Sequence, residues 1–106
     1  MSNDFTTMVR TERQLLRDQG QVMLTDDICE YSAEEFVQDM LLLVACKPAA
    51  ICVVISSDGG EIAAGLACIR VIRRAQRAGI HVIGEVYGHA MSMAFLILQH
   101  CDERVM

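Results

Sequence analysis

The centre of the chain reads Ile51-Cys52-Val53-Val54-Ile55-Ser56-Ser57-Asp58-Gly59-Gly60, an apolar, largely β-branched run that ends in polar residues and a glycine pair. The run over residues 51–55 predicts a strand that is covered on both faces. A helix over residues 61–78 and a strand over residues 80–87 follow, with Gly79 between them. A strand, a helix and a strand in this order predict a parallel β-α-β unit with a right-handed crossover.

The helix expected over residues 61–78 has two distinct faces. Apolar residues at helical spacing predict an inner face made of Ile62, Leu66, Ile69 and Ile72. The arginines of this helix fall mostly on the outer face, and their place in the last turns suits the helix dipole: Arg70, Arg73, Arg74 and Arg77. We expect them to form a solvated face rather than a binding patch.

A strand and a helix are expected before this unit. Residues 21–25 read as a short strand. A helix over residues 33–46 follows, with Ser32 at its N-cap and Glu35 reaching back to the serine N–H, the arrangement known as a capping box. Lys47-Pro48 ends this helix, since proline disfavours helical backbone at the residue before it. Its apolar face is expected to consist of Ala33, Phe36, Val37, Met40, Leu41 and Val44.

The second informative stretch is Gly88-His89-Ala90-Met91-Ser92-Met93-Ala94. Gly88 is expected to make the turn, and a helix over about residues 91–100 is apolar nearly all round, which predicts burial. Asp102 to Met106 reads as the entry to a further strand. The whole pattern predicts an α/β fold of repeated β-α units with a parallel sheet, incomplete at its C-terminus.

Both marked stretches follow strands, and in a parallel α/β fold ligands gather at the carboxyl ends of the strands. Ser92 is expected just inside a helix N-terminus, where free N–H groups favour a developing negative charge. Gly59-Gly60 lets backbone N–H groups approach a carbonyl oxygen closely. Two simpler interpretations stay open, because Asp-Gly-Gly often forms a hairpin turn and a helical serine often bonds to the preceding turn.

Composition excludes several classes of protein. The 106 residues suffice for one domain, and 53% of them are hydrophobic, so a core can form. A net charge of −5 argues against a nucleic-acid partner. The longest apolar region, residues 40–55, is broken by Lys47-Pro48 and falls short of the roughly 20 residues of a membrane span.

Five cysteines form no CxxC pair, so we expect buried free thiols in a reducing, cytoplasmic setting and no metal site or cofactor. Residues 1–20 are a polar N-terminal arm without the apolar core of a signal peptide. This arm carries Arg10, Arg13 and Arg17, for which a solvated role is expected rather than a docking role. The sequence leaves open whether a short helix forms around residues 12–17.

Residues 51–106 resemble the Clp protease proteolytic subunit, a serine endopeptidase of the crotonase-like superfamily. The family's Ser-Pro-Gly-Gly loop corresponds to Ser57-Asp58-Gly59-Gly60, and its following helix glycine corresponds to Gly65. The family's Gly-x-Ala-x-Ser-Met-(Gly/Ala) motif corresponds to Gly88, Ala90, Ser92, Met93 and Ala94. With a looser match over residues 21–46, the resemblance implies that residues 21–106 are the N-terminal part of one Clp-protease-like domain.

The resemblance implies roles for five residues. Ser92 would be the nucleophile that forms the acyl-enzyme, and the N–H groups of Gly60 and Met93 would hold the oxyanion. Gly59 and Gly88 would support the two loops. Asp58 departs from the family's proline; the change removes no donor, but we expect a looser loop and a negative charge near the oxyanion.

The general base is not evident in the chain. In the family the histidine lies about two dozen residues beyond the serine and the aspartate later still, so both are expected beyond residue 106 and the 106 residues alone are expected to be inactive. His81 and His100 are expected too far from Ser92, and His89, the nearest, lies on the turn. Lys47 lies at the wrong end of the sheet for a Ser–Lys dyad.

The resemblance further implies a homo-oligomeric ring, an ATP-driven unfoldase as partner and polypeptide substrates. Two other functions remain open. A crotonase-type acyl-CoA enzyme would use the same two backbone donors for an enolate without a serine nucleophile. A non-catalytic ring-assembly subunit would pack beside active partners.

Overall fold

The computed structural model describes residues 15–106. Its strands form one four-stranded sheet in the order β1-β2-β3-β4, and each neighbouring pair is parallel. The elements follow one another as β1 (Gln21–Thr25), α2 (Glu30–Cys46), β2 (Ala50–Ser57), α3 (Ile62–Arg77), β3 (His81–Ala90), α4 (Met93–Gln99) and β4 (Glu103–Val105). The α/β fold of repeated β-α units is confirmed. Residues 15–18 are helical and residues 19–20 form a turn, whereas residues 1–14 of the expected N-terminal arm lie outside the described residues.

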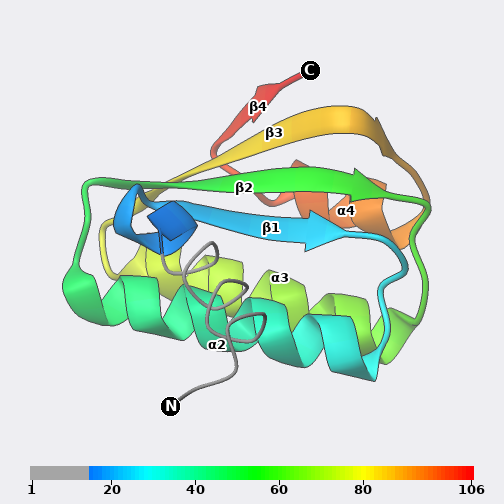
Figure 1. Cartoon of the computed structure of the whole chain (residues 1–106), viewed down its shortest axis with the longest axis horizontal. Coiled ribbons are helices and arrows are strands. Elements are labelled where there is room, and N and C mark those ends of the chain that lie inside the picture. The colour runs from blue at the N-terminus through cyan, green and yellow to red at the C-terminus, as the bar shows by residue number, and fades with distance from the viewer. Residues whose placement is uncertain (1–14) are drawn as a thin grey trace, which may run out of the picture.

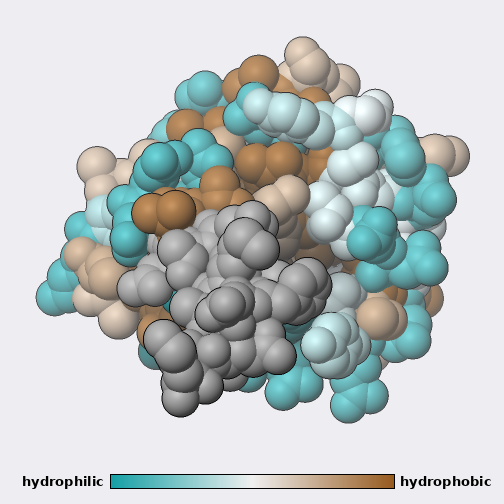
Figure 2. All heavy atoms as spheres, viewed as in Figure 1, coloured by the Kyte–Doolittle hydropathy of each residue, from teal (hydrophilic) through white to brown (hydrophobic). Residues whose placement is uncertain are grey.

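The three helices α2, α3 and α4 lie on one side of the sheet (Figure 1). Alternate residues of β1 and β2 face them and are fully buried, among them Val22, Leu24, Val53 and Ile55. The residues between these are only half-buried or exposed, and Met23 keeps 49% of its surface. The prediction that β2 is covered on both faces is therefore wrong for residues 15–106. Figure 2 shows hydrophobic side chains gathered over the strands.

The start of α2 differs from the prediction. Cys29, not Ser32, is the N-cap, and Ser32 occupies the third helical position. The Ser32 hydroxyl accepts the Cys29 N–H at 3.0 Å and donates to the Asp27 carbonyl at 2.8 Å. The serine thus performs the returning half of the capping box that was assigned to Glu35, and the helix begins three residues earlier. Lys47, at φ 53°, ends it as expected before Pro48.

Helix α3 has the expected bounds to within one residue and the expected exposed arginines. Its inner face is only partly as predicted, because Ile69 and Ile72 are buried whereas Leu66 is exposed and Ile62 keeps 71% of its surface. The remaining buried positions hold Val71 and four small residues: Ala64, Gly65, Cys68 and Ala75. They allow α3 to pack closely on α4, since a Cβ on Gly65 would overlap the Met93 side chain.

Strand β3 runs three residues further than predicted. Its pairing with β2 shifts between Ile55 and Ser57, so that Ser57 pairs with Ala90 and three residues of β3 bulge opposite Ser56. Gly88, at φ 98°, lies inside this bulge and does not make the turn. Helix α4 consequently starts only at Met93. It is not buried all round, because two residues of its outer side are exposed: Phe95 and Leu96.

Candidate active site

Ser92 stands at the turn from β3 to α4 in a backbone conformation that residues with a Cβ rarely adopt. Its φ is 54° and its ψ is −124°, and its side chain makes no capping hydrogen bond. A backbone of this kind costs about 1–3 kcal/mol and persists only where the surroundings enforce it. The Ala94 N–H donates to the Met91 carbonyl at 3.0 Å and the Leu96 N–H to the Ser92 carbonyl at 3.2 Å, so the turn is fixed on both sides. The result is an exposed hydroxyl on a sharp strand-to-helix turn.

The glycine pair after β2 is anchored to the segment between β1 and α2. The Ile28 N–H donates to the Gly59 carbonyl, and the Glu61 N–H donates to the Ile28 carbonyl, both at 2.8 Å. Gly60 has a φ of 154°, and a Cβ on it would overlap the Ile28 carbonyl oxygen. Only glycine fits at this position.

The structure brings the glycine pair against the serine turn. A Cβ on Gly59 would lie 2.8 Å from the Met91 carbonyl oxygen and 2.8 Å from the Ser92 Cβ. The Met91 N–H donates to the Ser57 carbonyl at 3.0 Å, which ties the end of β3 to the end of β2. Both stretches singled out in the sequence thus meet at the carboxyl edge of the sheet.

The two N–H groups expected to serve as oxyanion donors are those of Gly60 and Met93. Across residues 15–106 the Gly60 N–H has no protein acceptor, and the same holds for Met93. Neighbouring N–H groups are used, since that of Gly59 donates to the Ser57 hydroxyl at 3.1 Å. Two free N–H groups on the two loops beside an exposed serine hydroxyl can stabilise negative charge on a carbonyl oxygen.

A histidine–carboxylate contact that the sequence did not lead us to expect joins the two loops, and it is an ion pair when His89 is protonated. His89 Nε2 lies 2.6 Å from Asp58 Oδ1. The negative charge expected near the oxyanion is therefore paired with a histidine. Asp58 follows β2 and His89 lies near the end of β3, but the contact between them depends on the bulge in β3, which a local sequence pattern does not predict.

The described residues supply no base for Ser92. None of their histidines or lysines forms a hydrogen bond with its hydroxyl. His81 pairs with Glu103 at 3.2 Å near the opposite end of β3, and His100 is the C-cap of α4. Lys47 follows α2, before β2 begins. Serine attack on a carbonyl needs a proton acceptor, and no described histidine or lysine is hydrogen-bonded to Ser92 to serve as one.

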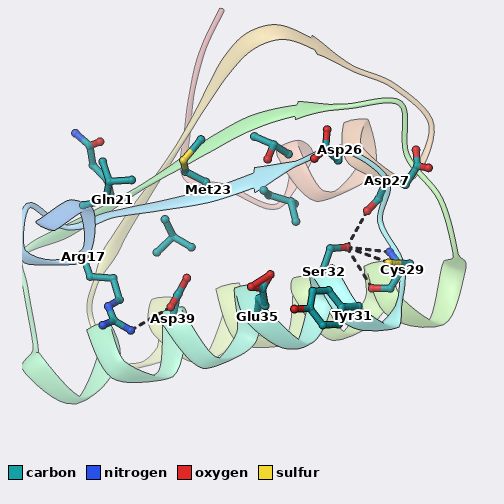
Figure 3. A pocket seen from close by; sticks show the side chains of 14 residues that line it. Arg17, Gln21, Met23, Asp26, Asp27, Cys29, Tyr31, Ser32, Glu35 and Asp39 are labelled. Atoms are coloured by element: carbon teal, nitrogen blue, oxygen red, sulfur yellow. Dashed lines mark hydrogen bonds and ion pairs between the residues drawn. The ribbon is translucent and has the colours of Figure 1, made fainter. Parts of the chain in front are cut away.

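A groove of about 460 Å³ runs between β1 and α2, away from Ser92. In Figure 3, Arg17 reaches from the segment before β1 to Asp39 of α2, at 3.2 Å, and Ser32 lies at the other end beside Cys29. The Ser32 N–H lowers the pKa of the Cys29 thiol, and its hydroxyl adds to the effect. No residue of the serine turn or of the glycine pair lines this groove.

No group of three or more metal-ligating side chains occurs among residues 15–106. No helix in that part of the chain is both long enough and apolar enough to cross a membrane. All five cysteines are free thiols; Cys68 and Cys101 are buried as expected, Cys29 and Cys52 are half-buried, and Cys46 is exposed.

Solved structures with this fold include the ClpP protease catalytic domain from Plasmodium falciparum, with a TM-score of 0.78 and 21% sequence identity over 91% of the chain. The ClpP1 N165D mutant from Listeria monocytogenes matches with a TM-score of 0.75 and 24% identity over 85% of the chain. The alignments take in 58% and 51% of those two chains, so this chain spans little more than half of their length. Among curated proteins, none matches it in sequence.

A family description extends over almost the whole sequence. The model of the Clp protease family matches residues 5–105, which include the glycine pair, the serine turn and all four strands. The fold of the two solved structures agrees with this match. The chain belongs to the Clp protease family.

Proposed function

We propose that this chain carries the nucleophile and the oxyanion donors of a serine endopeptidase of the Clp proteolytic-subunit type. One observation carries the proposal: Ser92 is exposed in a strained turn that contacts the Gly59–Gly60 loop. Strain at a single exposed serine is typical of sites where the side chain is held for reaction. Membership of the Clp protease family supports the same reaction.

The reaction proceeds through an acyl-enzyme. The Ser92 oxygen attacks the carbonyl carbon of a peptide bond. The carbonyl oxygen becomes an oxyanion that accepts hydrogen bonds from the N–H groups of Gly60 and Met93. Each such donor contributes about 3 kcal/mol to the transition state. The amine leaves with a proton, the acyl group stays as an ester on Ser92, and water then hydrolyses the ester. The histidine and aspartate that move these protons are proposed to lie beyond residue 106.

The proposal includes the setting of the enzyme. Polypeptides are its substrates, a homo-oligomeric ring encloses its sites, and an ATP-driven unfoldase delivers substrate. Free thiols fit a reducing compartment such as the cytoplasm. Family membership supports this setting, and the length of the two solved structures leaves room for further catalytic residues.

The strain at Ser92 also supports the peptidase over its two alternatives. A crotonase-type acyl-CoA enzyme needs the two N–H donors but no serine hydroxyl, so it has no use for a strained serine. A non-catalytic assembly subunit needs neither. Strain maintained at about 1–3 kcal/mol favours the function that uses the hydroxyl.

A fluorophosphonate probe tests the proposal on the protein purified from its natural source. We expect the probe to modify the peptide that contains Ser92, and Ser92→Ala to abolish the modification. The matched control is Ser56→Ala, which removes a half-buried hydroxyl near Gly88 and should leave labelling intact. A folded protein with no labelling at Ser92 contradicts the peptidase. Undiminished acyl-CoA turnover by Ser92→Ala would favour the crotonase type.

A further inference from the structure

The ion pair between Asp58 and His89 spans the two loops of the candidate site. Asp58 directly precedes the glycine pair, and His89 lies in the β3 bulge three residues before Ser92. We propose that Asp58 and His89 are positioning residues, which fix the Gly60 N–H relative to the Ser92 hydroxyl by tying the two loops together. This inference rests on the proposed function of Ser92.

Backbone hydrogen bonds hold the loop that contains Asp58 at the residues on both sides of Asp58, but not at Asp58 itself. The Ser57 carbonyl accepts the Met91 N–H, and the Gly59 carbonyl accepts the Ile28 N–H. Along the described chain, the backbone of Asp58 makes no hydrogen bond. Its carboxylate lies 2.6 Å from His89 Nε2, and this is the polar contact that Asp58 makes among the described residues.

The residues after Asp58 make such a contact useful. Gly59 and Gly60 have φ values of 104° and 154°, and glycine reaches many other conformations at little cost. A rotation at Asp58 would change the position of the Gly60 N–H relative to Ser92. Small displacements of this kind have large effects on rate, since catalysis depends on donors already in place.

The pair is suited to local positioning rather than to overall stability. The His89 side chain is 48% exposed and the Asp58 side chain 74% exposed, so solvent screens their attraction. Exposed ion pairs add little to the free energy of folding. Loss of the pair is therefore expected to loosen the loop while the protein stays folded.

The chain offers a matched control. His81 pairs with Glu103 at 3.2 Å, also at the surface, with side chains 48% and 56% exposed. It lies at the start of the same strand whose end carries His89. His81→Ala removes an equivalent pair far from Ser92.

The experiment compares four variants of the otherwise unaltered natural protein: His89→Ala, Asp58→Ala, the double variant and His81→Ala. The rate of amide hydrogen exchange in residues 57–61 measures the mobility of the loop. The rate of Ser92 labelling by a fluorophosphonate measures the reactivity of the site. We expect either substitution at the pair to speed exchange and to slow labelling on the order of tenfold to a hundredfold. The double variant should be no slower than either one, and His81→Ala should match the wild type. His89→Gln, which keeps a donor, should recover most of the rate.

Other outcomes overturn the inference in distinct ways. Unchanged exchange and labelling in His89→Ala, or losses that simply multiply in the double variant, exclude a positioning pair. A loss in His89→Ala as large as that of Ser92→Ala would make His89 the base instead. A wild-type protein that leaves Ser92 unlabelled overturns the proposed function itself, whereas a labelled wild type with an unaffected His89→Ala overturns only the role of the pair.

Discussion

At the scale of single residues, Ser92 combines a reactive side chain with an unfavourable backbone. Glycine is the residue that adopts its φ of 54° and ψ of −124° without strain. We predict that Ser92→Gly raises the free energy of unfolding by about 1 kcal/mol while abolishing probe labelling. Ser92→Ala removes the same hydroxyl but keeps a Cβ, so its stability should equal that of the wild type. Urea denaturation measures the free energy of unfolding of both variants. Equal values for Ser92→Gly and Ser92→Ala would show that the turn is unstrained.

The glycine pair yields a second prediction at this scale. Gly60→Ala forces a Cβ into the Ile28 carbonyl oxygen, whereas a Cβ on Gly79 meets no atom within 4 Å. Both glycines have positive φ values, 154° and 85°, so both variants carry a backbone penalty. We expect Gly60→Ala to be less stable than Gly79→Ala by about 2 kcal/mol, the cost of a steric overlap that the backbone must relieve. Similar urea midpoints for the two variants would contradict the close approach to Ile28.

The sequence identified most of the candidate site at this scale but not all of it. Ser92 and the Gly59–Gly60 pair follow from two short motifs on turns after strands, whereas the donor roles of Gly60 and Met93 come from the resemblance to the Clp protease proteolytic subunit and stay predictions. The partner of Asp58 could not be predicted, because the bulge that brings His89 across to it arises from a shift in strand register. Register is fixed by contacts between strands, which a single sequence does not display.

At the scale of elements, the approach of α3 to α4 supports the serine turn. Gly65 lies where a Cβ would overlap the Met93 side chain. We predict that Gly65→Ala displaces Met93 and slows probe labelling of Ser92 about tenfold, through misplacement of the Met93 N–H. Global stability should change little, since alanine favours helix over glycine by up to about 1 kcal/mol and offsets part of the overlap.

Relief of that overlap is the control. Met93→Ala removes the side chain that the new Cβ would meet but keeps the backbone N–H. The double variant Gly65→Ala with Met93→Ala should therefore label faster than Gly65→Ala alone. If Met93→Ala brings no recovery, the helix contact does not act through Met93.

Element types and order were predicted, and boundaries failed where capping and pairing are decided by contacts. Helix α2 starts at Glu30 because Ser32 occupies the third helical position, and Cys29 is the N-cap. Strand β3 extends beyond its apolar residues because its pairing with β2 continues as far as Ala90. In both cases the local pattern was compatible with two registers.

At the scale of the whole molecule, the buried thiols of the core make the stability of the fold depend on pH. Burial raises the pKa of Cys68 and of Cys101 from the ordinary 9.0 to about 12. Above pH 9 the unfolded chain loses these protons while the folded one keeps them, so unfolding becomes more favourable as pH rises. We predict a loss of stability from pH 9 towards pH 12, measured by urea denaturation at several pH values. The slope should diminish when both cysteines are replaced by alanine, and an undiminished slope would assign it to other groups.

The one-sided coverage of the sheet also belongs to this scale. The run from Ile51 to Ile55 is apolar at every position, so it suits a strand with two covered faces or one. In residues 15–106 the helices cover one face only, and the fold class was predicted although the number of layers was not (Figure 1).

The central claim is that Ser92 forms a covalent acyl intermediate, and trapping that intermediate tests it most directly. The protein from its natural source would be mixed with an activated peptide ester, quenched in acid within the first turnover and mapped by mass spectrometry. The account predicts an acyl group on the peptide that contains Ser92, lost in Ser92→Ala. Turnover of the ester with Ser92 unmodified, or undiminished turnover by Ser92→Ala, would contradict it.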